Sequence, residues 1–283
     1  MSDHLAHRPV KKTLQNSGML CNILGSMSKA FRGRHSGESM EMIETIVENG
    51  VATLRFDRGG KANALNAALI SALKAAADAL ARREDVRAIV LSGTPRVFAA
   101  GVDLKDAALW DGGETAMGRA QAMAQGGAMV EAWRRLPQPV IAAIEGPAIG
   151  GGAILALAAD FRVMAQSAYL RFPEVKLGMT LGWGGLALLV EGVGAARAKR
   201  ILLDDETLSA EASLTLGLCD KTAADGAAVQ TAQAWAVALA TMPAMPVQMT
   251  KASIDAAARQ NWAAASEMPE FFLARTQLET EMS

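Results

Sequence analysis

Two glycine-bearing turns constrain the fold of this chain most strongly. The first, Phe98–Leu104 (FAAGVDL), follows an apolar run that ends near Ser92, and the second, Glu145–Gly152 (EGPAIGGG), follows one that ends at Ile144. Each turn lies between an expected strand and an expected helix, where glycine allows unusual backbone angles and close approach of a ligand to main-chain N–H groups. A helix N-terminus adds free N–H donors and a positive dipole end. Two such donors aimed at one oxygen make an oxyanion hole, although either turn alone could serve only to reverse the chain.

Around these turns, strand-like and helical segments alternate. Asn49-Gly50 between two β-rich runs predicts a hairpin, and Asn66 is placed to cap a helix that runs to about Arg83. Beyond Gly182 the pattern is mostly helical, with a helix start at Ser209 and a loop over Thr222–Gly226. The other expected elements are strands over 86–92, 140–144 and 161–164, and helices over 114–136 and 153–159. This order predicts an α/β core followed by a helical region.

The distribution of histidine and cysteine limits the chemistry. All three histidines, His4, His7 and His35, precede the first regular pattern, so we expect neither a histidine-based triad nor a histidine-ligated metal. Cys21 and Cys219 form no CxxC pair, which fits a reducing compartment. With a formal net charge of -1, the chain shows no general attraction to nucleic acid or anionic membrane. Carboxylates, backbone amides, lysine or arginine must therefore supply the chemistry.

The first 40 residues differ in composition from the rest. Residues 1–40 are polar, basic and poor in acids, and they show no apolar periodicity. We expect a disordered or irregular extension and a cytoplasmic protein; a mitochondrial-type targeting peptide is the alternative. No apolar run is long enough to span a bilayer. A chain that starts at Met40 should keep its activity and its thermal midpoint, whereas a loss of several degrees would show that the extension packs on the body.

Five motifs in order resemble one enzyme family. They are Arg58-x4-Asn63-Ala-Leu-Asn66, then Phe98-Ala-Ala-Gly-Val-Asp-Leu104, then Pro139-Val-Ile-Ala-Ala-Ile-Glu-Gly146, then Ile149-Gly-Gly-Gly152, then Phe172-Pro-Glu-Val-x-Leu-Gly178. Over about residues 42–275 the chain resembles the crotonase (enoyl-CoA hydratase/isomerase) superfamily, and Gly182–Leu186 resembles the family's glycine-rich segment before a long helix.

The resemblance implies a fold, an assembly and a substrate class. The fold is α/β, a spiral of ββα units with a helical C-terminal region. It divides the chain into an N-terminal extension (1–40), a spiral core with the CoA and active site (41–205) and a helical region for trimerisation (206–283). Family members assemble as homotrimers or pairs of trimers and act on acyl-CoA thioesters. Coenzyme A is then part of the substrate, and no separate cofactor is expected.

By motif position, the resemblance also assigns site residues. The amides of Val102 and Gly151 would hold the thioester oxygen as it becomes an enolate, which agrees with the placement of donors where charge develops. The CoA ester would also contact Ala100, Asp103, Leu104, Lys105 and Ile154, with Lys105 near the CoA phosphates. A solvated surface lysine is the other interpretation of Lys105.

The acid/base positions indicate the reaction. The family's hydratases use two glutamates that hold a water between them. Glu174 occupies the second of these positions, but Ile154 occupies the first and cannot exchange a proton. One carboxylate beside an oxyanion hole suits removal of a proton from one carbon and its return to another, as in the family's Δ3,Δ2-enoyl-CoA isomerases. In an apolar pocket Glu174 would have a raised pKa, which suits a proton shuttle; otherwise it would cap or salt-bridge a surface turn.

Other interpretations stay open at the level of sequence. Enoyl-CoA hydratase is the chief alternative, and a decarboxylase, a thioester hydrolase or a non-catalytic CoA-ester-binding homologue are further ones. Gly182-x-Gly184-x-x-Ala187 with Asp204 superficially fits a dinucleotide fingerprint. The chain also departs from the family at Gly59-Gly60, where proline is usual, and at its C-terminal tail.

Overall fold

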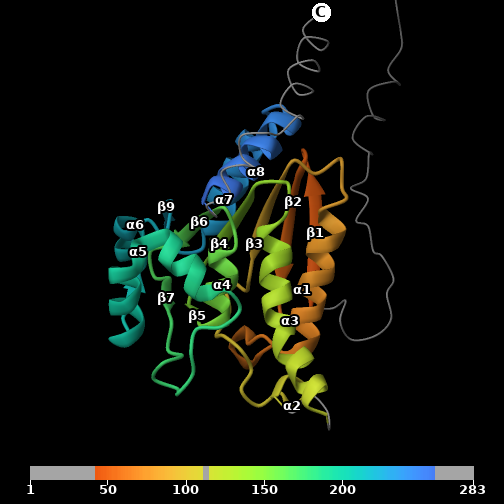
Figure 1. The fold of residues 1–283 in the computed structure, drawn as a ribbon. Coiled ribbons are helices and arrows are strands. Elements are labelled where there is room, and N and C mark those ends of the chain that lie inside the picture. The colour runs from red at the N-terminus through yellow and green to blue at the C-terminus, as the bar shows by residue number, and fades with distance from the viewer. Residues whose placement is uncertain (1–41, 111–114, 259–283) are drawn as a thin grey trace, which may run out of the picture. The chain divides into compact units, whose positions relative to one another are not determined.

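A computed structural model describes residues 42–110 and 115–258. The central feature is a six-stranded sheet, against which helices pack (Figure 1). In spatial order its strands are β1 (Ile43–Glu48), β2 (Val51–Phe56), β3 (Ala88–Ser92), β4 (Val140–Ile144), β6 (Phe161–Ala165) and β9 (Lys221–Ala223). All neighbours are parallel except β1 and β2, which form an antiparallel hairpin. Strands β3 and β4 are buried along their whole length, as expected for parallel strands covered on both faces.

The predicted hairpin and helix cap are both confirmed. Asn49 and Gly50 connect β1 to β2 with φ of 52° and 76°, the left-handed angles that a two-residue hairpin turn requires. The side chain of Asn66 accepts a hydrogen bond from the Leu69 N–H (3.0 Å) and caps the following helix. That helix ends at Leu80, slightly before the predicted end.

Helices cover the sheet on both sides (Figure 1). One helix, α7, packs against β2, β3, β4 and β6, whereas α1 and α3 pack against each other on the other side. The buried stripe of α7 consists of alanines at every fourth position, so the helix can approach the sheet closely. The helices are α1 (Ala67–Leu80), α2 (Ala107–Trp110), α3 (Ala116–Arg134), α4 (Gly151–Leu157), α5 (Gly185–Leu203), α6 (Ala210–Leu216), α7 (Ala228–Ala240) and α8 (Ala244–Ala258), with a 3₁₀ turn at Lys61–Asn63.

A second, three-stranded sheet lies beside the first. Its order is β5 (Ala148–Ile149), β7 (Tyr169–Arg171) and β8 (Thr207–Ser209), with β5 parallel and β8 antiparallel to β7. The Gly150 N–H donates to the Arg171 carbonyl (2.8 Å) and extends this pairing. The small sheet therefore fixes the second glycine-bearing turn next to the segment that leads to Glu174.

The α/β fold class is confirmed, and two local predictions are wrong. The loop predicted over Thr222–Gly226 begins as strand β9, which pairs with β6 at the edge of the main sheet. A strand of three residues is too short to show alternation in sequence. Helix α4 begins at Gly151, not Ala153, because the glycines themselves adopt the first helical turn. The predicted extension over 1–40, the three histidines and the C-terminal tail lie outside the described residues.

Two further features are absent from the described ranges. No helix there is long and apolar enough to cross a membrane. In residues 42–110 and 115–258, no three or more His, Cys, Asp or Glu side chains are grouped as a metal site would need.

Candidate active site

The two glycine-bearing turns meet beyond the carboxyl ends of β3 and β4. Because these strands are parallel neighbours, the segments that follow them leave the sheet at the same edge. Ala99 and Ala148 form a parallel bridge, and the Ile149 N–H donates to the Ala99 carbonyl (2.9 Å). At Gly101, where φ is +96°, a Cβ would lie 3.0 Å from the Ile149 oxygen and 3.9 Å from the Gly151 nitrogen. The backbones thus approach so closely that the position favours glycine.

The Val102 amide faces away from the segment that fixes it. The Leu65 N–H donates to the Gly101 carbonyl (2.7 Å), and the Asp103 N–H donates to the Leu65 carbonyl (2.9 Å). Val102 lies between these two bonded residues and is the parallel-bridge partner of Leu65. In such a bridge its N–H points away from the Leu65 segment. Both neighbours of Val102 are therefore hydrogen-bonded to Leu65, while the Val102 N–H remains available to a ligand.

The Gly151 amide is the first N–H of helix α4. The first hydrogen bond of this helix runs from the Ile154 N–H to the Gly150 carbonyl (2.9 Å), so Gly151 has no intrahelical acceptor. Neither Val102 nor Gly151 donates its N–H to a backbone oxygen in the part of the chain described here. Both candidate donors therefore lie on adjoining turns and are free to hydrogen-bond a ligand oxygen.

An ion pair that sequence reasoning did not identify holds the first turn. Arg58 Nη1 lies 2.8 Å from Asp103 Oδ2, with only 11% and 12% of the two side chains exposed. The Asn63 side chain accepts from the Arg58 N–H (2.9 Å) and donates to the Phe98 carbonyl (2.8 Å). The Lys105 N–H and then the Arg58 guanidinium lower the pKa of Asp103. Asp103, predicted to contact the CoA ester, has its carboxylate engaged in the protein, and no local pattern in the sequence reveals the pair.

Replacing Arg58 with alanine should destabilise the protein. The change leaves the Asp103 carboxylate largely buried without its guanidinium, a loss that typically costs about 3 kcal/mol of unfolding free energy. Urea unfolding measures this loss, with Arg55→Ala as the control because the Arg55 side chain is 44% exposed and pairs at the surface. Equal unfolding free energies for the two variants would contradict a structural role for Arg58.

Glu174 lies against the second glycine-bearing turn. It follows the buried Phe172 in the turn between β7 and α5, and a Cβ added to Gly150 would lie 2.6 Å from its Oε1 atom. Its Oε2 atom is buried and has no hydrogen-bond partner among the described residues. Burial raises the pKa of Glu174, and the negative charge of Asp205 raises it further. A carboxyl with a raised pKa and one buried, unpartnered oxygen is suited to proton transfer.

Asp205 is a second carboxylate near Glu174 that sequence reasoning missed. Arg171 Nε binds its Oδ1 atom at 2.9 Å, and Lys176 Nζ lies 3.2 Å from its Oδ2 atom. The hydrogen bond from Arg171 is the main reason that the pKa of Asp205 falls to about 2. Asp205 therefore stays ionised near neutral pH and influences Glu174 through its charge.

Ile154 occupies the interior one helical turn after Gly150. Its side chain is only 2% exposed, and a Cβ on Gly185 would lie 2.7 Å from its Cγ1 atom. The Ile154 N–H donates to the Gly150 carbonyl (2.9 Å), so Ile154 lies one turn after the glycine that Glu174 contacts. An apolar side chain thus occupies the position that the sequence motif assigns to the second glutamate of a hydratase.

The remaining predicted CoA contacts differ in their surroundings. Ala100 is partly buried and its N–H donates to the Ala62 carbonyl (3.1 Å), while Leu104 and Lys105 are exposed. Lys105 is therefore accessible to a charged ligand, and its predicted contact with CoA phosphates stays a prediction.

The dinucleotide interpretation is wrong. A dinucleotide fingerprint needs a strand directly before its glycines, but 172–184 contains no strand and β7 ends at Arg171. Asp204 is exposed at the C-terminal end of α5. The following glycine, Gly185, instead lies against Ile154.

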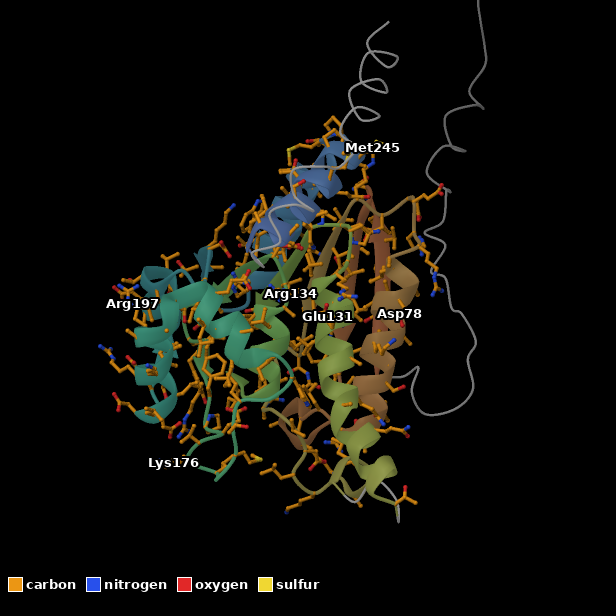
Figure 2. All side chains as sticks on the ribbon, viewed as in Figure 1. Asp78, Glu131, Arg134, Lys176, Arg197 and Met245 are labelled. Atoms are coloured by element: carbon orange, nitrogen blue, oxygen red, sulfur yellow. The ribbon has the colours of Figure 1, made fainter. Side chains whose placement is uncertain are left out.

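One cavity in the described part of the structure is separate from these residues. It has a volume of about 660 Å³ and is lined by Pro139 at the start of β4, Asp160 and Lys251 among others. The candidate site lies beyond the other end of β4. Figure 2 shows the same separation, with Met245 on α8 at one end of the described fold and Lys176, two residues after Glu174, at the other.

Comparison with known proteins identifies the family. Residues 47–282 match the model of the enoyl-CoA hydratase/isomerase family. The chain is 34% identical over 232 residues to a Mycobacterium leprae protein named "Probable enoyl-CoA hydratase". The matched region covers 79% of this chain and 79% of the relative. Among solved structures, Pseudomonas aeruginosa DspI has a TM-score of 0.75 and 28% identity, over 86% of this chain and 97% of its own. An enoyl-CoA hydratase from Bacillus anthracis has a TM-score of 0.71 and 26% identity, over 85% and 96% of the two chains. The chain belongs to the enoyl-CoA hydratase/isomerase family, an enzyme family of the crotonase superfamily.

Proposed function

We propose that the protein is a Δ3,Δ2-enoyl-CoA isomerase in which Glu174 carries the proton. The observation that carries this proposal is the buried Glu174 Oε2 atom, which has no hydrogen-bond partner among the described residues and belongs to a carboxyl placed against the Gly150-Gly151 turn. By motif position, the buried Ile154 stands where a hydratase of the family would have its second glutamate. Family membership implies an acyl-CoA substrate. Assembly as a homotrimer or hexamer stays a prediction.

The proposed reaction moves one proton and one double bond. The Glu174 carboxylate removes a proton from C2 of a 3-enoyl-CoA, and the electron pair spreads onto the thioester oxygen. The amides of Val102 and Gly151 stabilise the resulting dienolate, since hydrogen bonds to an oxygen strengthen as its charge grows. Glu174 then returns the proton to C4 as the double bond settles between C2 and C3. The same carboxyl must act as base and then acid, which its raised pKa favours.

Hydration of a 2-enoyl-CoA is the second candidate function. The names of two relatives favour it, since proteins of Mycobacterium leprae and Bacillus subtilis are both called probable enoyl-CoA hydratases. Hydration needs a base for the water and an acid for the α-carbon. Asp205 is unsuited to join Glu174 in this because Arg171 and Lys176 already bind its carboxylate. A hydratase would therefore have to run both transfers through Glu174.

A non-catalytic homologue that only binds CoA esters is the third candidate. Calorimetry with acetyl-CoA should show binding, while free acetate at the same concentrations should give none, because the two amides need the ester oxygen and CoA supplies the remaining contacts. Absence of heat or competition with any CoA ester would contradict both the enzyme and the binding protein. Binding without turnover of 2- or 3-enoyl-CoA would favour the binding protein.

The pH dependence of both activity and stability should reflect the raised pKa of Glu174. As a base Glu174 must be ionised, so kcat/KM should fall in acid with a midpoint above the ordinary glutamate value of about 4.3. The contribution of Glu174 to the free energy of unfolding should decrease as the pH rises, whereas that of a salt-bridged carboxylate increases. The folded state prefers protonated Glu174, and this preference, fully present below the ordinary glutamate pKa, is lost as pH rises through the raised one.

The thermal midpoint of Glu174→Gln relative to the original protein should therefore rise as the pH increases from the ordinary glutamate pKa of about 4.3 through the raised pKa of the folded state. Thermal unfolding across this range measures the difference, with Glu131→Gln as the control on the exposed face of α3 (Figure 2). A constant difference would mean that Glu174 ionises as freely in the folded protein as in the unfolded chain.

A further inference from the structure

The indole of Trp183 lies directly over the Gly151 position. A Cβ on Gly151 would meet the indole at Cζ3 (2.6 Å) and Cη2 (3.1 Å), and the Val102 Cγ2 atom at 3.1 Å. Only glycine fits beneath these groups without displacing them. The Trp183 ring and the Val102 side chain therefore close around the helix N-terminus whose amide faces the proposed thioester oxygen.

The opposite edge of the same ring reaches helix α3. A Cβ on Gly126 would lie 1.8 Å from Trp183 Cε2 and 2.3 Å from its Nε1 atom, and one on Gly127 would lie 3.7 Å from the Trp183 Cα atom. Two adjacent glycines are unfavourable inside a helix, by roughly 1 kcal/mol each relative to alanine. The room that the ring needs explains Gly126, whereas a Cβ on Gly127 would make an ordinary contact with the Trp183 Cα atom. The indole spans the space between α3 and the start of α4.

The backbone at Trp183 is held in an unfavourable conformation. Its φ is 53°, in the left-handed region, which costs a residue with a Cβ roughly 1 kcal/mol or more. The adjacent Gly184 has φ of 76° and accommodates the same bend at little cost. Strained non-glycine residues of this kind gather at binding and catalytic sites, where surrounding contacts maintain them. A ring fixed on both edges cannot turn aside easily for a ligand.

We propose that Trp183 is a specificity-determining residue that limits the length of the acyl chain. The inference rests on the proposed use of Glu174, Val102 and Gly151 on a CoA ester. With the thioester oxygen at the two amides and C2 to C4 beside Glu174, the first carbons of the acyl chain lie along Gly150 and Gly151. Glu174 contacts the first of these glycines and the Trp183 ring covers the second. Carbons beyond C4 then meet the face of the indole between α3 and α4.

Removing the ring should therefore lengthen the preferred acyl chain. Saturated butanoyl-, octanoyl- and dodecanoyl-CoA are suitable probes because they cannot be isomerised or hydrated. We expect the original protein to bind butanoyl-CoA better than dodecanoyl-CoA. In Trp183→Ala the ratio of dodecanoyl to butanoyl affinity should rise by about 10- to 100-fold, the range that one misfitting methylene or more produces in a closed pocket. Trp183→Phe, which keeps an aromatic ring between α3 and α4, should give a smaller rise.

The matched control is Trp235→Phe. Trp235 lies on α7, where its ring packs on Phe161 with centroids 4.6 Å apart, and it touches none of the three glycines. Its loss should leave the affinity ratio unchanged. If Trp183 only braced α3 against α4, its variants would lower the thermal midpoint and leave the ratio unchanged.

A second comparison tests the position of the ring without removing it. Gly126→Ala must displace the indole and should alter acyl-CoA binding in the original protein, yet it should have little further effect on binding in a Trp183→Ala background.

Calorimetry of the three CoA esters, with thermal unfolding of each variant, tests whether Trp183 limits the acyl chain length. A raised ratio in Trp183→Ala and in Trp183→Phe, with Trp235→Phe unchanged, supports the proposal. A ratio that stays within about twofold in folded Trp183 variants, or an original protein that already prefers dodecanoyl-CoA, overturns it and leaves the proposed function intact. If no CoA ester binds the original protein, the proposed function and this inference fall together.

Discussion

Replacing Glu174 with glutamine should lower the turnover of a 3-enoyl-CoA by about 10²- to 10⁴-fold, the range that a general base contributes. Glutamine keeps the size of the side chain and removes the proton acceptor. Because Glu174 Oε2 has no hydrogen-bond partner in the described chain, the exchange breaks no recorded contact of that atom. The amides of Val102 and Gly151 remain, so affinity for the CoA ester should be largely kept, and kcat and kcat/KM should fall together.

Steady-state kinetics on Glu174→Gln, with calorimetry of a saturated acyl-CoA, measures both effects. Glu131→Gln is the control, because the Glu131 carboxylate pairs with Arg135 on the surface of α3. Normal turnover in Glu174→Gln would remove Glu174 from the chemistry. A drop in affinity equal to the drop in kcat/KM would instead make it a binding residue.

Replacing Ile154 with glutamate should raise the ratio of hydratase to isomerase activity by at least about tenfold, since a second acid/base group contributes at least that much. Ile154 lies one turn after the glycine that Glu174 contacts, so a carboxyl there could hold a water that the apolar side chain excludes. The new carboxyl is buried, and its desolvation should lower the free energy of unfolding.

Ile154→Gln is the matched control. It has nearly the shape of the glutamate variant and the same polar intrusion into the core, but it cannot transfer a proton. Both rates should be measured on the original protein and the two variants, with one short and one medium acyl chain. An equal change of ratio in the glutamine variant would show that polarity alone admits water. An unchanged ratio in the glutamate variant would show that Ile154 does not decide between the reactions.

Features set by neighbouring residues could be predicted from sequence. Asn49-Gly50 specifies its hairpin because both positions need left-handed angles, and Asn66 caps α1 through an N–H three residues later. The paired glycine turns were predicted because each follows an apolar strand, and parallel pairing of β3 with β4 brings them together. The start of α4 was less predictable, since glycine is a weak helix former, yet the preceding strand and the following apolar turn place it there.

Features that join distant residues could not be predicted. Arg58 and Asp103 are 45 positions apart, and their pairing depends on the bridge between Leu65 and Val102. Arg171 and Asp205 are 34 positions apart, and no spacing rule relates an arginine at a strand end to an aspartate after a helix. The packing of Trp183 on Gly126 of α3 likewise joins residues that are far apart in the sequence. Such contacts are set by the fold. The effect of the Asp205 charge on the pKa of Glu174 therefore could not be predicted from the sequence.

One measurement tests the central claim most directly. The protein is incubated in separate reactions with a 3-enoyl-CoA and with the matching 2-enoyl-CoA, and products and initial rates are determined. We expect the 3-enoyl-CoA to become the 2-enoyl-CoA faster than the 2-enoyl-CoA gains water, because one carboxyl, with the apolar Ile154 at the other family position, can move a proton but holds a water poorly. Hydration of the 2-enoyl-CoA at hundreds of turnovers per second or about that order, with slower isomerisation, would contradict the account and make the protein a hydratase.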